Sequence, residues 1–379
     1  MSESIARIPN GMRYYCNSEA KARREVETIA MSVFAGWSYE EITTPTIDYY
    51  SLFNKGIGNT LADKAFKFAD ADGRILTVRP EVTSGVARAA ATLYANRARP
   101  LRFSYVASVF RQKQQSHAEW RREITQIGCE LIGRNSRVAD LEVLLIALEI
   151  FRQLELEHDL VITLNNVEIL KGIADGLQLD PNSREELRRL VDSRNAQDIT
   201  AFLQLYTPRE DASAFARLVQ LSGKEEVFGP AQRIITNPRS LAALDRLQVL
   251  WQTIQSLDLA ERFEIDLGNV SQLDYYTGLT FTIYVRGAGA ALGSGGRYDD
   301  LLANFGKSEP AIGFVLNLDA LSDLLSARSN RVVEARRQTW ETISSVDRDS
   351  LELFREALRK REIGKCIRID MNEVGTCAN

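Results

Sequence analysis

The feature of this sequence that most constrains its fold is a set of long segments with the two-residue period of β-strands. Residues 279–285 alternate apolar and polar side chains, the pattern of a strand with one buried face. Two further strand-like segments, 101–111 and 123–132, flank a polar loop rich in Gln, Lys and Arg. Long paired strands with helices set around them indicate an α+β domain on an antiparallel sheet, not a doubly wound parallel sheet.

Changes of pattern along the chain predict four parts. Residues 1–164 and 259–325 hold the strand-like segments and form the two parts of one core. Residues 165–258 lack convincing strands, and apolar residues from Leu244 to Leu257 recur at helical spacing, so this part is predicted to be a helical insert. Residues 326–379 are predicted to form a short C-terminal α/β segment with one helix, 349–360, and one strand, 366–369.

Composition excludes several classes of protein. The chain has 379 residues, which suits two or three domains, and its net charge of −4 argues against nucleic-acid binding through a broad basic face. Its four cysteines show no Cys-x-x-Cys spacing and it has two histidines, so no metal site is predicted. No secretory signal and no run long enough to span a bilayer is found, so we expect a cytoplasmic protein that makes no membrane contact.

Two glycine-containing motifs resemble nucleotide-binding loops and are rejected. Gly306-Lys307-Ser308 has the end of a P-loop, but Leu301 occupies the position of the required upstream glycine. The glycines between 287 and 296 are predicted to form a turn between strands, because no βαβ unit follows them. No cofactor is therefore predicted.

Five segments, taken in order, carry a resemblance to a known family. They are the strand 41–45, Thr77-Val78-Arg79-Pro80-Glu81-Val82-Thr83, the strands around Arg111 and Gln126-Ile127-Gly128-Cys129-Glu130, Asp274-Tyr275-Tyr276, and Gly295-Gly296-Arg297-Tyr298-Asp299. Together they are similar to the core of class II aminoacyl-tRNA synthetases, and in particular to the histidyl-tRNA synthetase family. The first segment resembles the element through which that class forms dimers. Any one of these motifs would be weak, whereas the ordered set is specific.

The resemblance implies a pocket for histidine. An α-ammonium group needs a carboxylate and neutral acceptors, which Glu81, Thr83 and Gln126 would provide. The imidazole has two ring nitrogens, so reading it needs groups at both ends. By resemblance, Glu130 and Tyr276 take those roles.

Two more residues complete the implied pocket. Tyr298 would close it, and Arg111 would supply a cation near the ligand. Tyr275 is expected to point to the opposite face of a strand from Tyr276 and to pack in the core. Taken singly, a glutamate or tyrosine on a strand usually serves the fold or faces solvent, so these assignments rest on the family resemblance.

The departures from the family pattern concern chemistry. Adenylate formation brings an α-phosphate against a carboxylate, so fixed cations are needed, and the family uses three arginines. Arg111 keeps one of them, whereas Ser271 and Ala320 occupy the other two positions, and Lys113 replaces a glutamate of the motif 2 loop. Removing a single transition-state donor typically costs about 10²–10³ in rate. Efficient adenylation is therefore not expected, and no catalytic residue is assigned.

The whole pattern resembles the family of ATP phosphoribosyltransferase regulatory subunits. The residues after Arg328 are too few for a complete anticodon-binding domain of about a hundred residues, so no tRNA is expected. The resemblance implies a non-catalytic chain, dimeric within a hetero-octamer, that activates a short catalytic subunit in the first step of histidine biosynthesis and mediates feedback inhibition by histidine. Two alternatives stay open: an adenylating enzyme, which would exchange pyrophosphate into ATP, and a scaffold with a vestigial pocket.

Overall fold

The protein is described here from a computed structural model, which covers residues 6–57, 62–112, 121–269, 275–329, 341–344 and 350–370. The chain divides into two compact units, Met1–Leu325 and Ser326–Asn379. In the described ranges no helix has the length and apolar character needed to cross a membrane.

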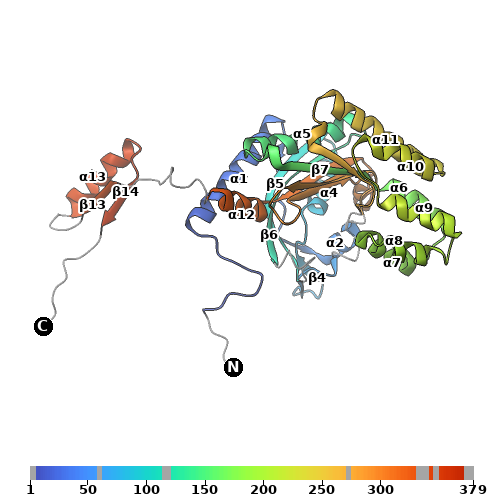
Figure 1. The fold of residues 1–379 in the computed structure, drawn as a ribbon. Helices are drawn as coiled ribbons and strands as arrows, with labels where there is room; N and C mark the ends of the chain where they lie inside the picture. The colour runs from blue at the N-terminus through green and yellow to red at the C-terminus, as the bar shows by residue number, and fades with distance from the viewer. Residues whose placement is uncertain are drawn as a thin grey trace. The chain divides into compact units, whose positions relative to one another are not determined.

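The first unit is built on a nine-stranded sheet (Figure 1). Its strands, in spatial order, are β1 (Glu40–Glu41), β5 (Leu101–Phe110), β6 (Glu123–Ile132), β12 (Ala311–Asn317), β11 (Gly293–Arg297), β10 (Leu279–Val285), β7 (Leu160–Asn166), β9 (Phe263–Asp266) and β8 (Ser222–Gly223). The central pairs are antiparallel, which confirms the predicted α+β fold. The sheet is nevertheless mixed, because β1 pairs with β5 and β7 with β9 in parallel.

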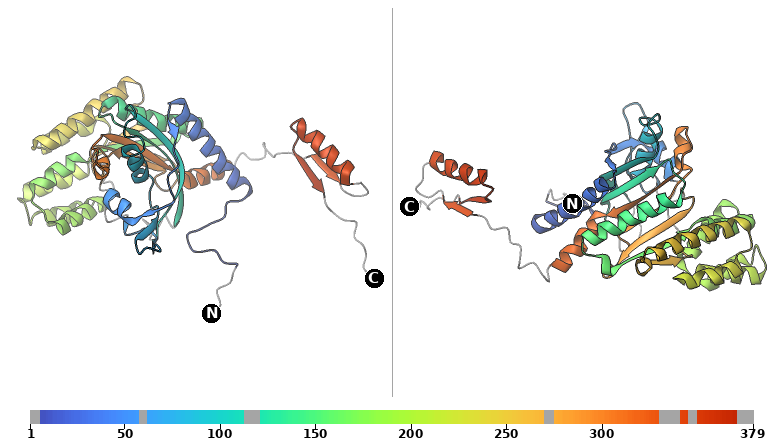
Figure 2. Two further views of the ribbon diagram at one scale, coloured as in Figure 1. Left: turned by 180° about the vertical axis from the view of Figure 1, so that it is seen from behind. Right: turned by 90° about the horizontal axis from the view of Figure 1, so that it is seen from above.

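One face of this sheet is apolar and covered by helices. Helices α1 (Asn17–Gly36) and α5 (Arg137–Gln153) lie along it (Figure 2). Helix α5 begins after Ser136, whose side chain accepts a hydrogen bond from the Ala139 backbone N–H, as an N-cap does. Alternate residues of β6, Ile127, Cys129 and Leu131, are buried in the same apolar cluster. This face is therefore a packed apolar core.

The opposite face carries a second apolar cluster and the space beside it. Helix α4 (Thr83–Ala91) and the short 3₁₀ helix η4 (Leu301–Phe305) pack there against β5. A three-stranded sheet of β2 (Ile47–Tyr49), β4 (Ile75–Val78) and β3 (Lys67–Ala69), with helix α2 (Tyr50–Ile57), precedes α4 in the chain. Strand β4 of this sheet leads directly to the start of α4, where two of the predicted pocket residues lie.

Strand β11 corrects one prediction, because its glycines form a central strand and not a turn. A Cβ atom on Gly295 would lie 2.5 Å from the carbonyl oxygen of Gly313 and 2.5 Å from Cζ of Phe281. Glycine inside a strand marks such a close approach of neighbouring groups. The glycines of β11 reflect tight packing between β10 and β12, whereas Gly287 and Gly289 lie in the predicted turn between β10 and β11.

Because of this packing, one methyl group added at Gly295 is expected to have a large effect on stability. Gly295→Ala is expected to lower the free energy of unfolding by about 1–3 kcal/mol, because the neighbours of Gly295 include backbone atoms that cannot rotate away. Urea denaturation followed by fluorescence would measure it. Gly176→Ala is the matched control, since a Cβ there meets no atom within 4 Å. Equal stability of the two variants would contradict the packing described for β11.

The part between β7 and β9 is mainly helical. It contains α6 (Glu168–Gly176), α7 (Pro181–Ser193), α8 (Ala196–Leu203), α9 (Arg209–Val219), α10 (Phe228–Ile234) and α11 (Pro238–Ser256). Helices α7 and α11 begin with proline after Asp180 and Asn237, whose side chains accept backbone N–H groups of the first turn. The insert also holds the two-residue strand β8, which the sequence did not predict and which pairs with β9.

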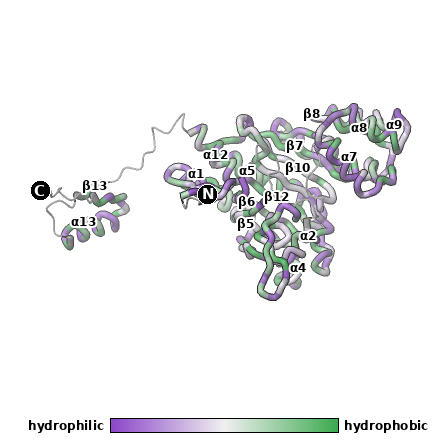
Figure 3. Tube along the Cα trace, turned by 90° about the horizontal axis from the view of Figure 1, so that it is seen from below, coloured by the Kyte–Doolittle hydropathy of each residue, from purple (hydrophilic) through white to green (hydrophobic). Residues whose placement is uncertain are grey.

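The insert acts as the crossover that makes β7 and β9 parallel, since parallel neighbours need a long connection. Helices α7, α8 and α9 lie on the opposite side of the sheet from α1 and α12 (Leu318–Ser329) (Figures 1 and 2). Helix α7 is largely hydrophilic (Figure 3), with Leu187 and Val191 as its buried residues. The insert thus presents a polar helix surface while packing on the sheet edge.

In the second unit, helix α13 (Ser350–Glu362) connects β13 (Glu341–Ser344) and β14 (Ile367–Asp370), which pair in parallel. The sequence predicted the helix and β14 but not β13. A small apolar cluster of Ile343, Leu353 and Ala357 holds the unit together.

Candidate functional site

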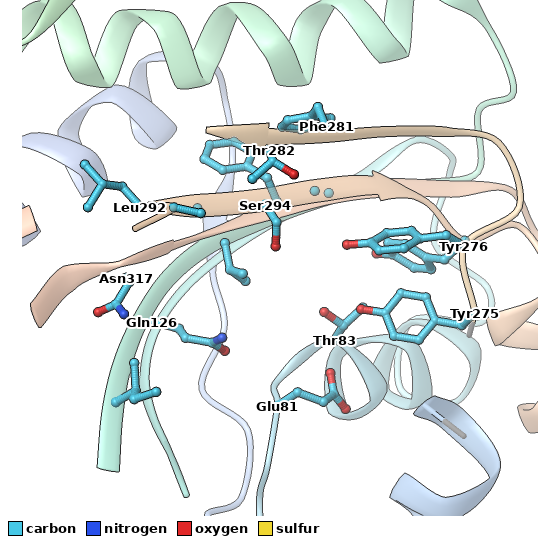
Figure 4. A pocket seen from close by; sticks show the side chains of 18 of the residues that line it. Glu81, Thr83, Gln126, Tyr275, Tyr276, Phe281, Thr282, Leu292, Ser294 and Asn317 are labelled. Carbon is cyan, nitrogen blue, oxygen red and sulfur yellow. The ribbon is translucent and has the colours of Figure 1, made fainter. Parts of the chain in front are cut away.

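A cavity of about 330 Å³ opens on the α4 side of the large sheet (Figure 4). Its lining includes every residue that the sequence assigned to the pocket: Glu81, Thr83, Arg111, Gln126, Glu130, Tyr276 and Tyr298. These residues come from the start of α4, the ends of β5 and β11, strand β6 and the segment before β10. The fold therefore brings residues from across the first unit to one place.

Strand alternation explains how β6 contributes to both faces. Gln126, Gly128 and Glu130 have the opposite orientation to Ile127 and Cys129, because successive side chains of a strand point to opposite faces. Strand β12 pairs with β6 in register, Gly313 opposite Glu130 and Asn317 opposite Gln126. The cavity thus has a polar floor on the reverse side of an apolar sheet face.

Glu130 is the centre of the hydrogen-bond network in the cavity, and its side chain is 1% exposed. Its Oε1 accepts hydrogen bonds from the Thr83 hydroxyl at 2.8 Å and the Tyr105 hydroxyl at 3.0 Å, and its Oε2 accepts one from Tyr298 at 2.5 Å. Burial raises the pKa of Glu130 to about 7, although the three hydroxyls favour the carboxylate and oppose that shift. A group of this kind can accept an N–H from a ring or pair with an imidazolium.

Tyr105 belongs to this network, and sequence reasoning missed it. It lies on β5 opposite Gly128, and a Cβ atom on Gly128 would come within 2.7 Å of the Tyr105 hydroxyl oxygen. The glycine therefore leaves the space through which Tyr105 reaches Glu130. The glycine at position 128, within strand β6 and two residues from Glu130, was the available signal.

Two further glycines form the floor beneath the recognition groups. Gly296 of β11 and Gly313 of β12 are partners in register. A Cβ atom on Gly313 would lie 1.8 Å from Oε2 of Glu130, and one on Gly296 would lie 2.8 Å from Cε1 of Tyr276. The Glu130 carboxylate and the Tyr276 ring therefore lie where only glycine permits them.

The other end of the cavity suits a cation. Both oxygens of Glu81, which is 5% exposed, accept the backbone N–H of Ser84 at 3.1 Å. Burial raises the pKa of Glu81, while its bonds to Ser84 and the nearby Arg111 charge oppose the shift. Oε1 of Gln126 is buried without a hydrogen-bond partner among the described residues. Since an unsatisfied buried acceptor costs about 1–3 kcal/mol, this end favours a ligand that donates hydrogen bonds.

An aromatic wall completes the cavity and corrects the prediction for Tyr275. Tyr275 lines the cavity together with Tyr276, and its ring centroid lies 4.9 Å from that of Tyr276 and 5.7 Å from that of Tyr298. Tyr275 packs against buried apolar residues, as predicted, but it does not face away from Tyr276, because strand β10 begins only at Leu279. Residues 275 and 276 precede the strand, so its alternation does not govern them.

The chain is similar to known proteins over most of its length. A sequence model of the histidyl-tRNA synthetase family matches residues 11–321. The ATP phosphoribosyltransferase regulatory subunit of Moorella thermoacetica is 35% identical over 318 residues, covering 83% of this chain and 80% of the relative. The chain belongs to this family of regulatory subunits. The subunit of Acetivibrio thermocellus is 30% identical over 373 residues, covering 98% of this chain and 88% of the relative.

Solved structures extend the family relationship over the fold. A crystal structure from Bacillus halodurans, described as an ATP phosphoribosyltransferase regulatory subunit/histidyl-tRNA synthetase, has a TM-score of 0.84 and 26% identity, and the match covers 99% of this chain and 96% of that one. Histidyl-tRNA synthetase from Nostoc shares the fold, with a TM-score of 0.76 at 18% identity over 99% of this chain. The class II synthetase-like fold is thereby confirmed.

Of the positions compared with the synthetase pattern, Arg111 lines the cavity, whereas Ala320 does not. Arg111 donates from Nε to the carbonyl oxygen of Pro80 at 3.2 Å. Ala320, in the place of a family arginine, lies on α12 and packs against the large apolar cluster. Ser271 and Lys113 lie outside the described residues. At position 320, where the resemblance places a family arginine, this chain has an alanine that packs against the core.

The raised pKa of Glu130 predicts a pH-dependent stability. In the unfolded chain a glutamate ionises near pH 4.5, whereas folded Glu130 keeps its proton until about pH 7. Between these values the folded state binds more protons, so its stability falls as pH rises and levels off above pH 7. Relative to Glu130→Gln, the wild type is expected to lose up to about 3 kcal/mol across this range, measured by urea denaturation at each pH.

Glu264→Gln provides the control for this titration, because Glu264 is an exposed glutamate on β9. Its pH profile should parallel that of the wild type. A Glu130→Gln profile that also parallels the wild type would show that Glu130 ionises normally in the folded protein.

Proposed function

We propose that this chain is a non-catalytic regulatory subunit of ATP phosphoribosyltransferase and that the cavity on the α4 side of the sheet binds histidine. The names of its relatives support the role in histidine biosynthesis and a catalytic subunit as partner. The observation that carries the ligand assignment is Glu130, held by three hydroxyls over Gly313. Packing alone does not require this hydrogen-bond network, since an apolar residue of the same shape could fill the space of Glu130.

Histidine satisfies the groups at both ends of the cavity. Its imidazole N–H would donate to Glu130, with the Tyr276 hydroxyl at the other ring nitrogen. Its α-ammonium group would meet Glu81, Thr83 and the unpaired Gln126 oxygen, and its carboxylate would face Arg111. A ligand lacking the ring would supply neither the further N–H donor to Glu130 nor a partner for the Tyr276 hydroxyl, and a polar pocket discriminates through such missing contacts.

Regulation then follows from a coupling between this cavity and the catalytic subunit. We propose a dimer of this chain within a hetero-octamer, without tRNA as a ligand. Histidine would favour the less active arrangement through differential contacts, and couplings of this kind are typically about 1–3 kcal/mol, or roughly 5- to 150-fold in affinity. No chemistry on histidine is required of the chain.

Reconstitution with a short-form catalytic subunit tests this function. The mixture should transfer phosphoribosyl groups faster than the catalytic subunit alone, and histidine should inhibit the mixture. Lack of activation by the chain would refute the regulatory role. Histidine-dependent exchange of pyrophosphate into ATP would instead support an adenylating enzyme, and the absence of any thermal shift with millimolar histidine would support a scaffold with a vestigial pocket.

A further inference from the structure

The helical insert supports the segment that carries Tyr276. The ammonium group of Lys171, on α6, donates a hydrogen bond to the carbonyl oxygen of Tyr276 at 2.6 Å. The backbone N–H of Val167, just before α6, donates to the carbonyl oxygen of Gly278 at 3.0 Å. On the core side, Thr277 donates its N–H to the carbonyl oxygen of Arg297 at 2.8 Å. The start of the insert thus provides two of these three anchors.

The insert also borders the cavity on both sides of Tyr276. Asp192, on α7, lines the cavity that contains Glu130. A second cavity of about 330 Å³ lies between the core and helices α6, α7 and α9, and Tyr276 and Asn269 line both cavities. Tyr276 therefore stands at the wall between them. In Figure 4 its ring projects into the first cavity beside Thr83 and Tyr275.

The second cavity has a mainly apolar lining on the insert side, from Leu170 and Ala174 of α6, Leu187 and Val191 of α7 and Phe215 of α9. The cavity is partly open to solvent and borders α6 and α7, so it leaves room for these helices to change position relative to the core. The contact between Lys171 and Tyr276 also joins the insert to the core.

We propose that Lys171 is a positioning residue for Tyr276 and that helices α6 and α7 register whether the histidine cavity is occupied. The inference rests on the proposed function and adds the route by which histidine binding reaches the insert. A ligand that contacts the Tyr276 hydroxyl selects one position of the 275–278 segment, and Lys171 and Val167 transmit that position to α6. The ligand thereby shifts the population of insert arrangements by its differential contact with them.

Hydrogen exchange and calorimetry on the full chain test this route. In the wild type, saturating histidine should slow amide exchange in α6 and α7. Lys171→Met keeps the aliphatic stem but removes the donor, so histidine affinity should fall about three- to tenfold, as expected for one hydrogen bond, and the exchange response of α6 should shrink. Lys171→Arg, which keeps a cationic donor, should restore both.

Arg184→Met is the matched control, because Arg184 lines the second cavity but donates to the Leu179 carbonyl oxygen and pairs with Asp175. It should bind histidine as the wild type does. Unchanged affinity in Lys171→Met, or a wild-type α6 and α7 whose exchange ignores histidine, would overturn the inference while leaving the histidine site intact. A wild type that binds no histidine would instead refute the site itself, and this inference with it.

Discussion

Glu130→Gln is expected to weaken histidine binding about 10- to 100-fold. The substitution preserves the volume of the side chain above Gly313 and, at a pH above the Glu130 pKa of about 7, removes its charge. Hydrogen bonds to charged groups contribute about 1.5–3 kcal/mol, and each 1.4 kcal/mol corresponds to a factor of ten. The glutamine amide has one oxygen, so only one of its two ends can accept hydrogen bonds. One of the hydroxyls of Thr83, Tyr105 and Tyr298 therefore loses its acceptor. Titration calorimetry with histidine on the purified chain would measure the loss.

Glu130→Gln also distinguishes the sensing of histidine from the activation of the catalytic subunit. In the complex with the catalytic subunit, Glu130→Gln should still activate phosphoribosyl transfer but should require correspondingly more histidine for inhibition. The exposed strand glutamate variant Glu264→Gln should behave as the wild type in both assays. Normal affinity in Glu130→Gln would place the inhibitory histidine outside this cavity, for instance at a subunit interface.

Glu81→Gln is expected to weaken histidine binding by a similar 10- to 100-fold, but for a different reason. Glu81 is buried and lies at the end of the cavity where Gln126 has an unpaired oxygen. The substitution would remove the carboxylate that pairs with the α-ammonium group of histidine. Imidazolepropionate lacks that ammonium group, so its affinity should change little between the wild type and the variant.

Calorimetry with both ligands on both proteins forms a double-mutant cycle for this contact. If the coupling free energy is close to the full loss of binding free energy in Glu81→Gln, the α-ammonium group of histidine contacts Glu81. Glu81 also accepts the Ser84 N–H at the start of α4, a role that glutamine can retain. Equal losses for the two ligands would therefore mean that Glu81 supports the helix and does not contact the ammonium group.

Local pattern was sufficient for several elements of the fold. The predicted strands 123–132 and 279–285 agree with β6 and β10, and the predicted start of a helix near Thr83 agrees with α4. These elements have a regular period over several residues, and that period depends on the sequence of the element itself. Strand β8 has two residues and no period to detect, and the glycines of β11 have the composition of a turn.

The sequence by itself indicated the family, the long periodic strands and helices and, through the family resemblance, the seven candidate pocket residues, because ordered motifs and periodicity are properties of a linear chain. Only the tertiary structure placed Tyr105 on Glu130, Gly313 beneath its carboxylate and Lys171 on the Tyr276 carbonyl. These contacts join segments distant in sequence at separations of a few ångströms. Such distances follow from strand register and helix packing, which no single segment encodes.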